Sequence, residues 1–329
     1  MIFILHHNRY WTECLSFLTK NTQKFSLISS TQAVEGYNHI KMEVFDPNKH
    51  KIILTPGRLH EPTSQNMIIM RFLHSPGFFA YPVVRAYAEL VTHHKNSDYR
   101  FLVLDDLYKA LILREFESEA VEHFKYQMME DPKIVRLKLN PTMHLIKEAP
   151  KLHTRSPGTG LLALTWLLVD NDFPRFLNIC RTLRKELKIN ILLHPLMRME
   201  EKILKQIQDL EGTLFERVYY NLTKEELIQI YDQNEYIISD GSGSCYEAMV
   251  RGCKPLAVRG LRCIPNNEVF NETLDEEYLP FPSYDEINKN IFFDTDIFLQ
   301  KHFSYLYKYT KQEAEKIAEN EILSLDILK

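Results

Sequence analysis

Glycine, cysteine and long apolar runs are all scarce in this sequence. The chain of 329 residues contains ten glycines and five cysteines. No apolar run approaches the roughly 20 residues that cross a bilayer, so we expect no transmembrane helix. The cysteines are odd in number and scattered, without the paired spacing of a zinc site, which is typical of reduced thiols in a cytoplasmic protein.

An excess of one charge is also lacking. The chain has 40 Lys and Arg against 44 Asp and Glu, for a formal net charge of −4. This balance argues against general nucleic-acid binding, so no nucleic-acid partner is expected. The first seven residues, MIFILHH, have no basic n-region and too short an apolar stretch for a signal peptide. We expect them to form a first strand of a cytoplasmic protein.

Strand-length apolar runs alternate with amphipathic segments, which is typical of a parallel α/β sheet. Residues 140–160 are rich in Pro, Thr, Ser and Gly and predict a linker, after which the alternation starts again. We therefore predict an α/β protein with two doubly wound, Rossmann-like domains facing a cleft, 1–150 and 151–329. The predicted strands are Ile2–Leu5, Phe25–Ile28, Lys51–Leu54, Asn66–Leu73, Tyr99–Leu104, Ile134–Leu139, Leu161–Leu168, Ile189–Leu193, Phe215–Tyr220, Tyr236–Ser239 and Lys254–Val258.

The most informative stretch is 236–258, which reads YIISDGSGSCYEAMVRGCKPLAV and predicts strand, small-residue loop, short helix and strand. The loop exposes backbone N–H groups at a helix N-terminus, where partial positive charge favours an anion. Ser242, Gly243 and Ser244 are therefore candidate ligands of a phosphate or pyrophosphate. The alternative is a tight turn in which Ser242 or Ser244 caps the helix. The loop matches neither a Walker sequence nor the dinucleotide G-x-G-x-x-G pattern.

Three polar groups follow predicted strands: His74, His194 and the loop that begins at Asp240. Ligands of open parallel sheets bind beyond the carboxyl ends of the strands. The coincidence of three such groups favours a binding site over three separate structural features.

These elements occur in an order that resembles a known group of enzymes. The chain has His74-Ser-Pro-Gly after a strand, then Leu164-Thr165-Trp166, His194-Pro195, Asp240-Gly-Ser-Gly-Ser, Glu247-Ala248 and Gly252-Cys-Lys-Pro255. This order resembles the GT-B transferases, most closely the CDP-glycerol glycerophosphotransferase family that builds teichoic-acid and capsule-like polymers. The chain departs from that family at Ser75, where the family has Gly, and at Gly241, where it has Tyr. The second half is also similar to the non-hydrolysing UDP-N-acetylglucosamine 2-epimerases, whose early Gly-Thr-Arg-Pro-Glu element is missing here.

The resemblance implies roles on the donor side. A protonated His194 would stabilise charge on the donor phosphates, unless it is a structural histidine. Glu247 would accept hydrogen bonds from ribose hydroxyls; the alternative is an ordinary surface glutamate. Thr165 would contact the donor.

Other residues are assigned to catalysis and to the acceptor. By the resemblance, His74 would be the base that removes the acceptor proton, the alternative being a strand-end histidine bonded to backbone. Arg9 follows the first strand and would meet an anionic acceptor. Asp240 would orient the loop or accept a hydroxyl, because a carboxylate beside phosphate is unfavourable.

No metal or cofactor is expected. No Asp-x-Asp motif stands at a strand end, and Asp105-Asp106 is interpreted as a helix N-terminal pair. Adjacent His6 and His7 would point to opposite faces of a strand, so they form a poor metal pair. The sequence thus predicts a metal-independent mechanism.

The resulting hypothesis is a transferase in capsule or lipopolysaccharide biosynthesis. It would move a glycosyl or polyol-phosphate group from a CDP-, CMP- or UDP-linked donor to a hydroxyl of a cell-surface glycan, polyol-phosphate or lipid-linked acceptor. The alternatives are a nucleotide-sugar 2-epimerase or hydrolase on the same fold, and a non-enzymatic module that binds a glycan or partner. Aromatic residues after His74 leave open a peripheral contact with the inner face of the membrane: Phe78, Phe79, Tyr81 and Tyr87.

Overall fold

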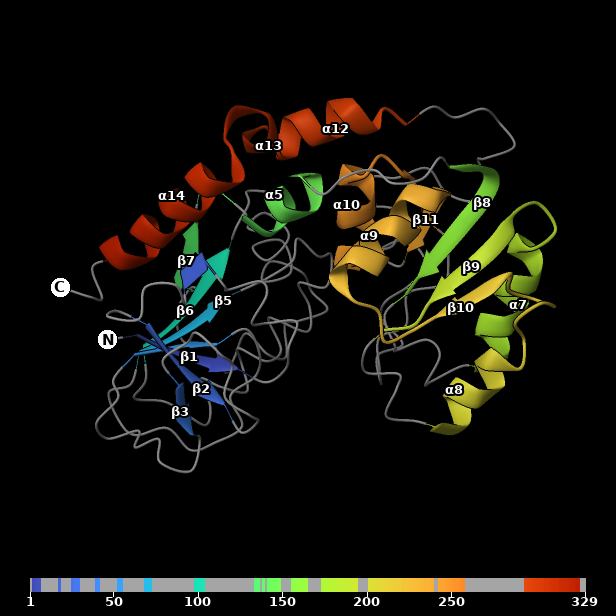
Figure 1. The fold of residues 1–329 in the computed structure, drawn as a ribbon, viewed down its shortest axis with the longest axis horizontal. Helices are drawn as coiled ribbons and strands as arrows, with labels where there is room; N and C mark the ends of the chain where they lie inside the picture. The colour runs from blue at the N-terminus through green and yellow to red at the C-terminus, as the bar shows by residue number, and fades with distance from the viewer. Residues whose placement is uncertain are drawn as a thin grey trace, which may run out of the picture. The chain divides into compact units, whose positions relative to one another are not determined.

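The computed structural model describes the strands of the first half of the chain and most of the second half. The described residues are 2–6, 17–18, 25–29, 39–41, 52–55, 68–72, 98–103, 133–136, 138–139, 141–148, 155–164, 173–194, 201–239, 242–257 and 293–325. By their contacts the residues form two units, Met1–Leu145 with Ser304–Lys329, and Ile146–Phe303. Each unit is built around one parallel sheet (Figure 1).

The sheet of the first unit has seven parallel strands in the order β3-β2-β1-β4-β5-β6-β7. Six of them lie where the sequence predicts strands. The exception is β3, whose three residues are too few to show an alternating pattern. The strands are β1 Ile2–His6, β2 Phe25–Ser29, β3 His39–Lys41, β4 Ile52–Thr55, β5 Ile68–Phe72, β6 Asp98–Val103 and β7 Lys133–Arg136.

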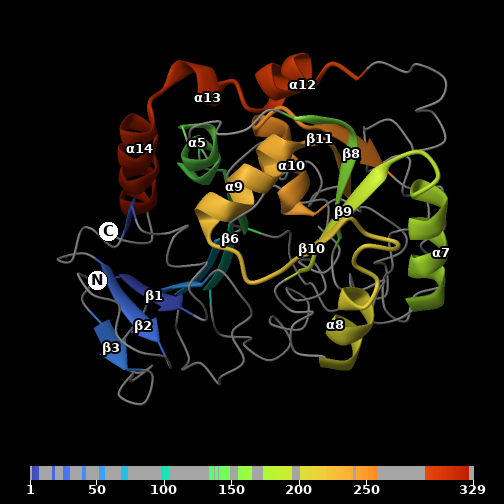
Figure 2. The same ribbon diagram turned by 45° about the vertical axis from the view of Figure 1, so that its right-hand side comes forward.

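The sheet of the second unit has five parallel strands in the order β10-β9-β8-β11-β12. Helices α7 and α8 lie on one face of the sheet and α9 and α10 on the other, so this unit is doubly wound (Figures 1 and 2). The α/β class with two parallel sheets is confirmed. The elements are β8 Ser156–Ala163, α7 Phe173–Leu183, β9 Lys188–Leu192, α8 Glu201–Gln208, β10 Arg217–Tyr219, α9 Lys224–Gln233, β11 Asn234–Ser239, α10 Gly243–Val250 and β12 Lys254–Ala257.

The core of the second unit explains why these segments form strands and helices. Phe176, Cys180 and Leu183 recur at helical spacing on α7 and are fully buried against Ile189 and Ile191 of β9. An amphipathic helix gains most of its stability by covering such a sheet face. The apolar strands are buried on both faces, as is usual in a parallel sheet.

Much of 140–160 is regular structure, contrary to the prediction of a linker over this range, and residues 140 and 149–154 lie outside the described residues. Helix α5 occupies Pro141–Glu148, with Met143 and Ile146 buried, and β8 begins at Ser156. Proline is well suited to the first position of a helix, so Pro141 starts α5 and does not mark a loop. Gly160 suits its place inside β8, because a Cβ there would lie 2.8 Å from Cδ1 of Ile238, which would have to shift.

The last described segment, 293–325, is mostly helical. It forms α12 Thr295–His302, α13 Tyr305–Lys308 and α14 Lys311–Ser324. By contacts, α12 belongs to the second unit and the other two helices to the first. The sequence-based domain boundary between residues 150 and 151 placed all three helices in the second domain. The assignment of separate functions to domains 1–150 and 151–329 stays a prediction.

Candidate functional site

The strand order of the second unit creates one special position at the edge of its sheet. Strands β8 and β11 are neighbours, and the direction of winding reverses between them. In open parallel sheets, ligands bind at such a switch point, beyond the carboxyl ends of the strands. β8 ends at Ala163 and β11 at Ser239, so the loop after Ser239 leaves the sheet at this point.

Ser242 connects this loop to both strands. Its hydroxyl donates a hydrogen bond to the carbonyl of Ala163 at 3.1 Å, and its N–H donates to Oγ of Ser239 at 3.0 Å. Ser242 has the backbone position of the N-cap of α10, but its side chain makes no capping bond. Ser242 therefore has the backbone conformation that the serine-capped turn predicts, but its side chain does not cap the helix.

The start of α10 consequently presents backbone donors without a side-chain cap. The first N–H groups of a helix have no acceptor within the helix. Here the N–H of Cys245 bonds the carbonyl of Ser242 at 3.0 Å, and the helix offers no acceptor to Gly243 and Ser244. Both residues are half-buried. This combination of amide donors and a positive helix end is suited to an anion.

The other end of α10 is closed as the sequence predicts. Gly252 has φ +88°, and the N–H of Cys253 bonds the carbonyl of Ala248 at 2.9 Å. The N–H of Gly252 bonds the carbonyl of Met249 at 2.7 Å, which completes a Schellman motif. The helix is thus fixed at both ends, with its N-terminus beside the switch point.

Glu247 is not the exposed surface glutamate of the simpler alternative. It is 5% exposed and lies between α9 and α10. Lys224 Nζ lies 3.2 Å from Glu247 Oε1, and the hydroxyl of Tyr231 donates to Glu247 Oε2 at 3.1 Å. Burial, and then the charge of Glu247, raise the pKa of Tyr231 well above its ordinary value, so its hydroxyl keeps the proton it donates. Sequence reasoning missed Lys224 and Tyr231, because their positions become close to Glu247 only when α9 packs against α10.

His194 lies at the same edge of the sheet as the α10 loop. It lies two residues beyond the end of β9 and is half-buried. β9 borders β8, with Ala163 opposite Leu192, so His194 is about 10 Å across the strands from the β11 end. The structure therefore brings His194 and Ser242–Ser244 to one edge of one sheet. Four predicted site residues lie outside the described residues: Arg9, His74, Thr165 and Asp240.

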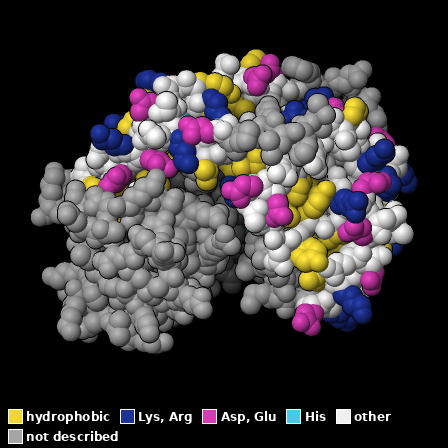
Figure 3. All heavy atoms as spheres, in the orientation of Figure 1, with side chains coloured by type: hydrophobic (Ala, Val, Ile, Leu, Met, Phe, Trp, Pro, Cys, Tyr) yellow, Lys and Arg dark blue, Asp and Glu magenta, His cyan; other side chains and the backbone are white. Residues whose placement is uncertain are grey.

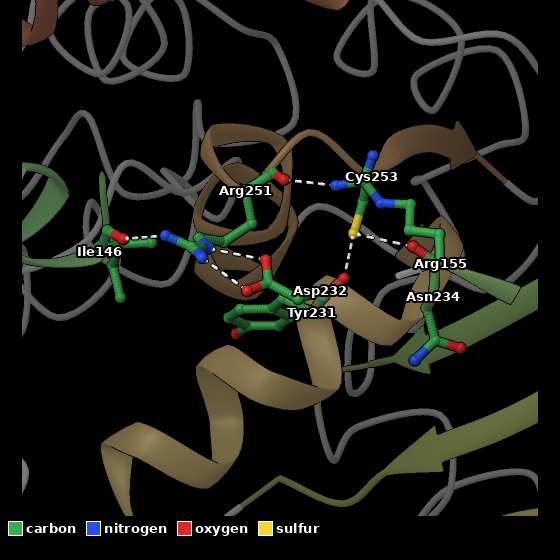
Figure 4. A network of polar contacts seen from close by, with 7 residues as sticks. All are labelled: Ile146, Arg155, Tyr231, Asp232, Asn234, Arg251 and Cys253. Atoms are coloured by element: carbon green, nitrogen blue, oxygen red, sulfur yellow. Dashed lines mark hydrogen bonds and ion pairs between the residues drawn. The ribbon is translucent and has the colours of Figure 1, made fainter. Parts of the chain in front are cut away.

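A buried polar network joins the C-terminal ends of α9 and α10 (Figure 4). Arg251 donates through Nε to Asp232 Oδ1 at 2.9 Å and through Nη1 to the carbonyl of Ile146 at 3.0 Å. Arg155 donates to the carbonyl of Arg251, and the Cys253 thiol donates to the carbonyl of Tyr231 at 3.0 Å. These bonds hold the C-terminus of α10 against α9, and so fix where its N-terminus points.

Neither a metal cluster nor a membrane span is found in the part of the chain that the structure describes. No three His, Cys, Asp or Glu side chains there are placed to hold a metal ion. Within the same residues, no helix has the length and apolar character that crossing a bilayer requires.

The sequence matches no protein-family model and no curated protein. Solved structures do resemble the chain. A Methanocaldococcus jannaschii UDP-GlcNAc 2-epimerase, solved with UDP-GlcNAc and UDP, is 13% identical with a TM-score of 0.49, and the match covers 86% of this chain and 88% of that one. The wall teichoic acid polymerase TagF is 12% identical with a TM-score of 0.49, over 97% and 82% of the two chains.

A third similar structure is WaaG, a glycosyltransferase involved in lipopolysaccharide biosynthesis. It is 10% identical with a TM-score of 0.44, and the match covers 100% of this chain and 96% of that one.

Proposed function

We propose that the protein is a metal-independent transferase of the GT-B type that uses a nucleotide-activated donor. The donor phosphates bind Ser242, Gly243 and Ser244, with His194 beside them, and Thr165 and Glu247 contact the nucleoside. The group transferred is a glycosyl or polyol-phosphate group, and a glycan or lipid-linked acceptor supplies the hydroxyl. His74 removes its proton, and Arg9 and Asp240 lie on the acceptor side.

One observation carries this proposal: the hydroxyl of Ser242 bonds Ala163 at the switch point and leaves the α10 amides without a side-chain cap. A structural turn would use the serine as the acceptor for those amides. A ligand with several phosphate oxygens supplies the missing acceptors, and a diphosphate also matches the positive helix end.

The face of the described residues that Figure 3 presents shows no extended patch of one charge. Figure 3 shows Lys and Arg interspersed with Asp and Glu on the face it presents, outside the grey atoms. Interspersed charge of both signs is typical of an ordinary solvated surface. This supports a small anionic ligand at the α10 loop over an extended polyanion on that face.

The direct test is a thermal-shift panel of CMP, CDP, UMP, UDP and GDP. A ligand that binds only the folded protein raises its Tm by mass action. We expect a cytidine or uridine diphosphate to raise Tm more than the monophosphate. Absence of any shift at millimolar nucleotide would contradict the proposal.

A matched pair of variants at Gly243 tests the amide itself. Gly243→Pro removes one N–H donor at the first helical position, where proline is well tolerated, and the extended ψ of 156° at Ser242 suits a following proline. Gly243→Ala keeps the N–H and is the control. Hydrogen bonds to charged groups contribute about 1.5–3 kcal/mol, so we expect Gly243→Pro to weaken diphosphate binding roughly 10- to 100-fold in calorimetry.

Product analysis separates transfer from the alternative reactions on the same fold. An epimerase converts a nucleotide-sugar without an acceptor and releases no bulk free nucleotide. A transferase releases nucleotide only when the acceptor is present, and His74→Ala abolishes that release if His74 is the base. A non-enzymatic module would keep its cellular function in the same variant.

A further inference from the structure

Lys224 occupies a position that helix stability does not explain. It is the first residue of α9, next to the N-cap Thr223, where the positive helix end disfavours a cation. The following residues, Glu225 and Glu226, have the charge that this position favours. The side chain of Lys224 is nevertheless 9% exposed, so its charge is held inside the second unit.

The partner of this buried cation is Glu247, whose side chain is 6% exposed. The charged groups are 3.2 Å apart, and Tyr231 donates to the other carboxylate oxygen at 3.1 Å. The side chain of Ser244 lies close enough to Tyr231 to lower the pKa of its hydroxyl, against the stronger effects of burial and Glu247 that raise it. Polar contacts therefore run from Lys224 through Glu247 to Tyr231, which neighbours Ser244 at the start of α10.

Glu247 is three residues beyond Ser244 on α10, which is about 4.5 Å along the helix axis. A buried carboxylate on the first turns of α10 adds negative charge near the start of the helix, and this charge opposes the binding of a diphosphate there. Buried ion pairs rarely gain stability over apolar side chains of the same volume, so folding alone gives little reason for this one. Its electrostatic effect on the neighbouring anion site gives a better one.

We propose that Lys224 is a positioning residue of the donor site: it neutralises Glu247, and with Tyr231 fixes its carboxylate, so that the start of α10 can accept a diphosphate. This inference rests on the proposed function. It adds that the donor site depends on a positive charge from α9, which balances the charge of Glu247 although α9 need not touch the phosphates.

A charge cycle tests the inference, with inorganic pyrophosphate and UDP as probes in calorimetry. Lys224→Met leaves the carboxylate unbalanced, and we expect pyrophosphate to bind about 10-fold more weakly. Glu247→Gln leaves the cation unbalanced, and we expect binding to tighten several-fold. The double variant Lys224→Met/Glu247→Gln has neither charge and should return close to the wild-type affinity, while Lys224→Arg should preserve it.

The two probes separate the charge effect from a contact with ribose. If Glu247 also bonds the ribose, Glu247→Gln weakens UDP binding while it tightens pyrophosphate binding. Circular-dichroism melting of each variant checks that the second unit is folded. Should Lys224→Met fail to fold, the tightening in Glu247→Gln and the affinity of the double variant decide the question.

Two results of this charge cycle would contradict the proposed role of Lys224. If Glu247→Gln does not tighten pyrophosphate binding, or the double variant binds as weakly as folded Lys224→Met, charge neutralisation is not the role of Lys224. If wild-type protein binds neither probe, or if Gly243→Pro leaves binding unchanged, the proposed function fails instead.

Discussion

At the scale of single residues, Arg251 makes several hydrogen bonds inside the second unit. Its guanidinium contacts both carboxylate oxygens of Asp232 and the carbonyl of Ile146, and both charged side chains are 1% exposed. A buried pair of this kind adds little over apolar packing. Removal of one partner, however, leaves an uncompensated charge in a low-dielectric interior.

We therefore expect Asp232→Ala to lower the free energy of unfolding by about 3–5 kcal/mol, measured by urea denaturation. Lys254→Ala is the control, because Lys254 pairs with Glu235 at 2.9 Å but its side chain is 60% exposed. Exposed pairs contribute about 0–1 kcal/mol. Equal losses in the two variants would show that Arg251 is not confined as described.

The sequence predicts the identity of the site residues better than their surroundings. The small-residue loop and the helix after it make Ser242–Ser244 candidate phosphate ligands from the sequence alone, and their role stays a prediction. The burial of Glu247 could not be predicted, since it depends on α9 lying against α10. Charge alone suggests a surface for Lys224, and only the packed structure shows its partner.

At the scale of elements, α9 and α14 share the same start signal. Thr223 and Glu226 form a capping box on α9, and Thr310 and Glu313 form another on α14. In each box the threonine side chain accepts from a backbone N–H, and the glutamate accepts from the threonine N–H in return. The local sequence therefore determines the residue at which each of these two helices begins.

We expect Thr223→Ala to destabilise the second unit by about 1 kcal/mol at neutral pH, measured by urea denaturation. The bonds from Thr223 lower the pKa of Glu226 from its ordinary value of 4.5. A lowered pKa means a contribution that is complete above about 4.5 and is lost as the pH falls through the lowered value.

Glu226→Gln provides the control for this pH dependence, because glutamine can complete a capping box without titrating. We expect wild-type protein to lose more stability than this variant on acidification below pH 4.5. Parallel pH profiles of the two proteins would contradict the assignment of the effect to Glu226.

The elements that were predicted wrongly share a physical cause. Proline and glycine in residues 140–160 predict a loop by composition, but Pro141 starts α5 and Gly160 lies in the centre of a sheet. Glycine in a strand normally weakens it, but here the close approach of the Ile238 side chain from β11 favours it. That preference comes from tertiary packing, which a local pattern does not contain. Where burial and local pattern agree, as in β11 and β12, the predicted strand ends lie within two residues of the observed ones.

At the scale of the whole molecule, the contact units and the sequence-based domains make different predictions about fragments. The unit 146–303 retains the carbonyl of Ile146 that accepts from Arg251. A fragment 151–329 lacks this acceptor. It also carries α14, whose buried Ala314, Ala318 and Ile322 belong by contacts to the first unit.

We expect fragment 146–303 to unfold cooperatively in urea and fragment 151–329 to be less stable and to expose more apolar surface. An unsatisfied buried donor costs about 1–3 kcal/mol, and exposed apolar helix faces favour association. Circular dichroism and size-exclusion chromatography of the two fragments give the comparison. A more stable 151–329 would support the sequence-based boundary.

The sulfur atoms of the second unit have a practical consequence. Cys180, Cys245 and Cys253 are fully buried, and burial raises the pKa of the Cys180 thiol, so alkylating reagents reach thiolate only when the surrounding structure opens. One lies on α7, one in the first turn of α10 and one beside Gly252. Their rates of modification would therefore report how often three different parts of one sheet domain open locally, without any added label.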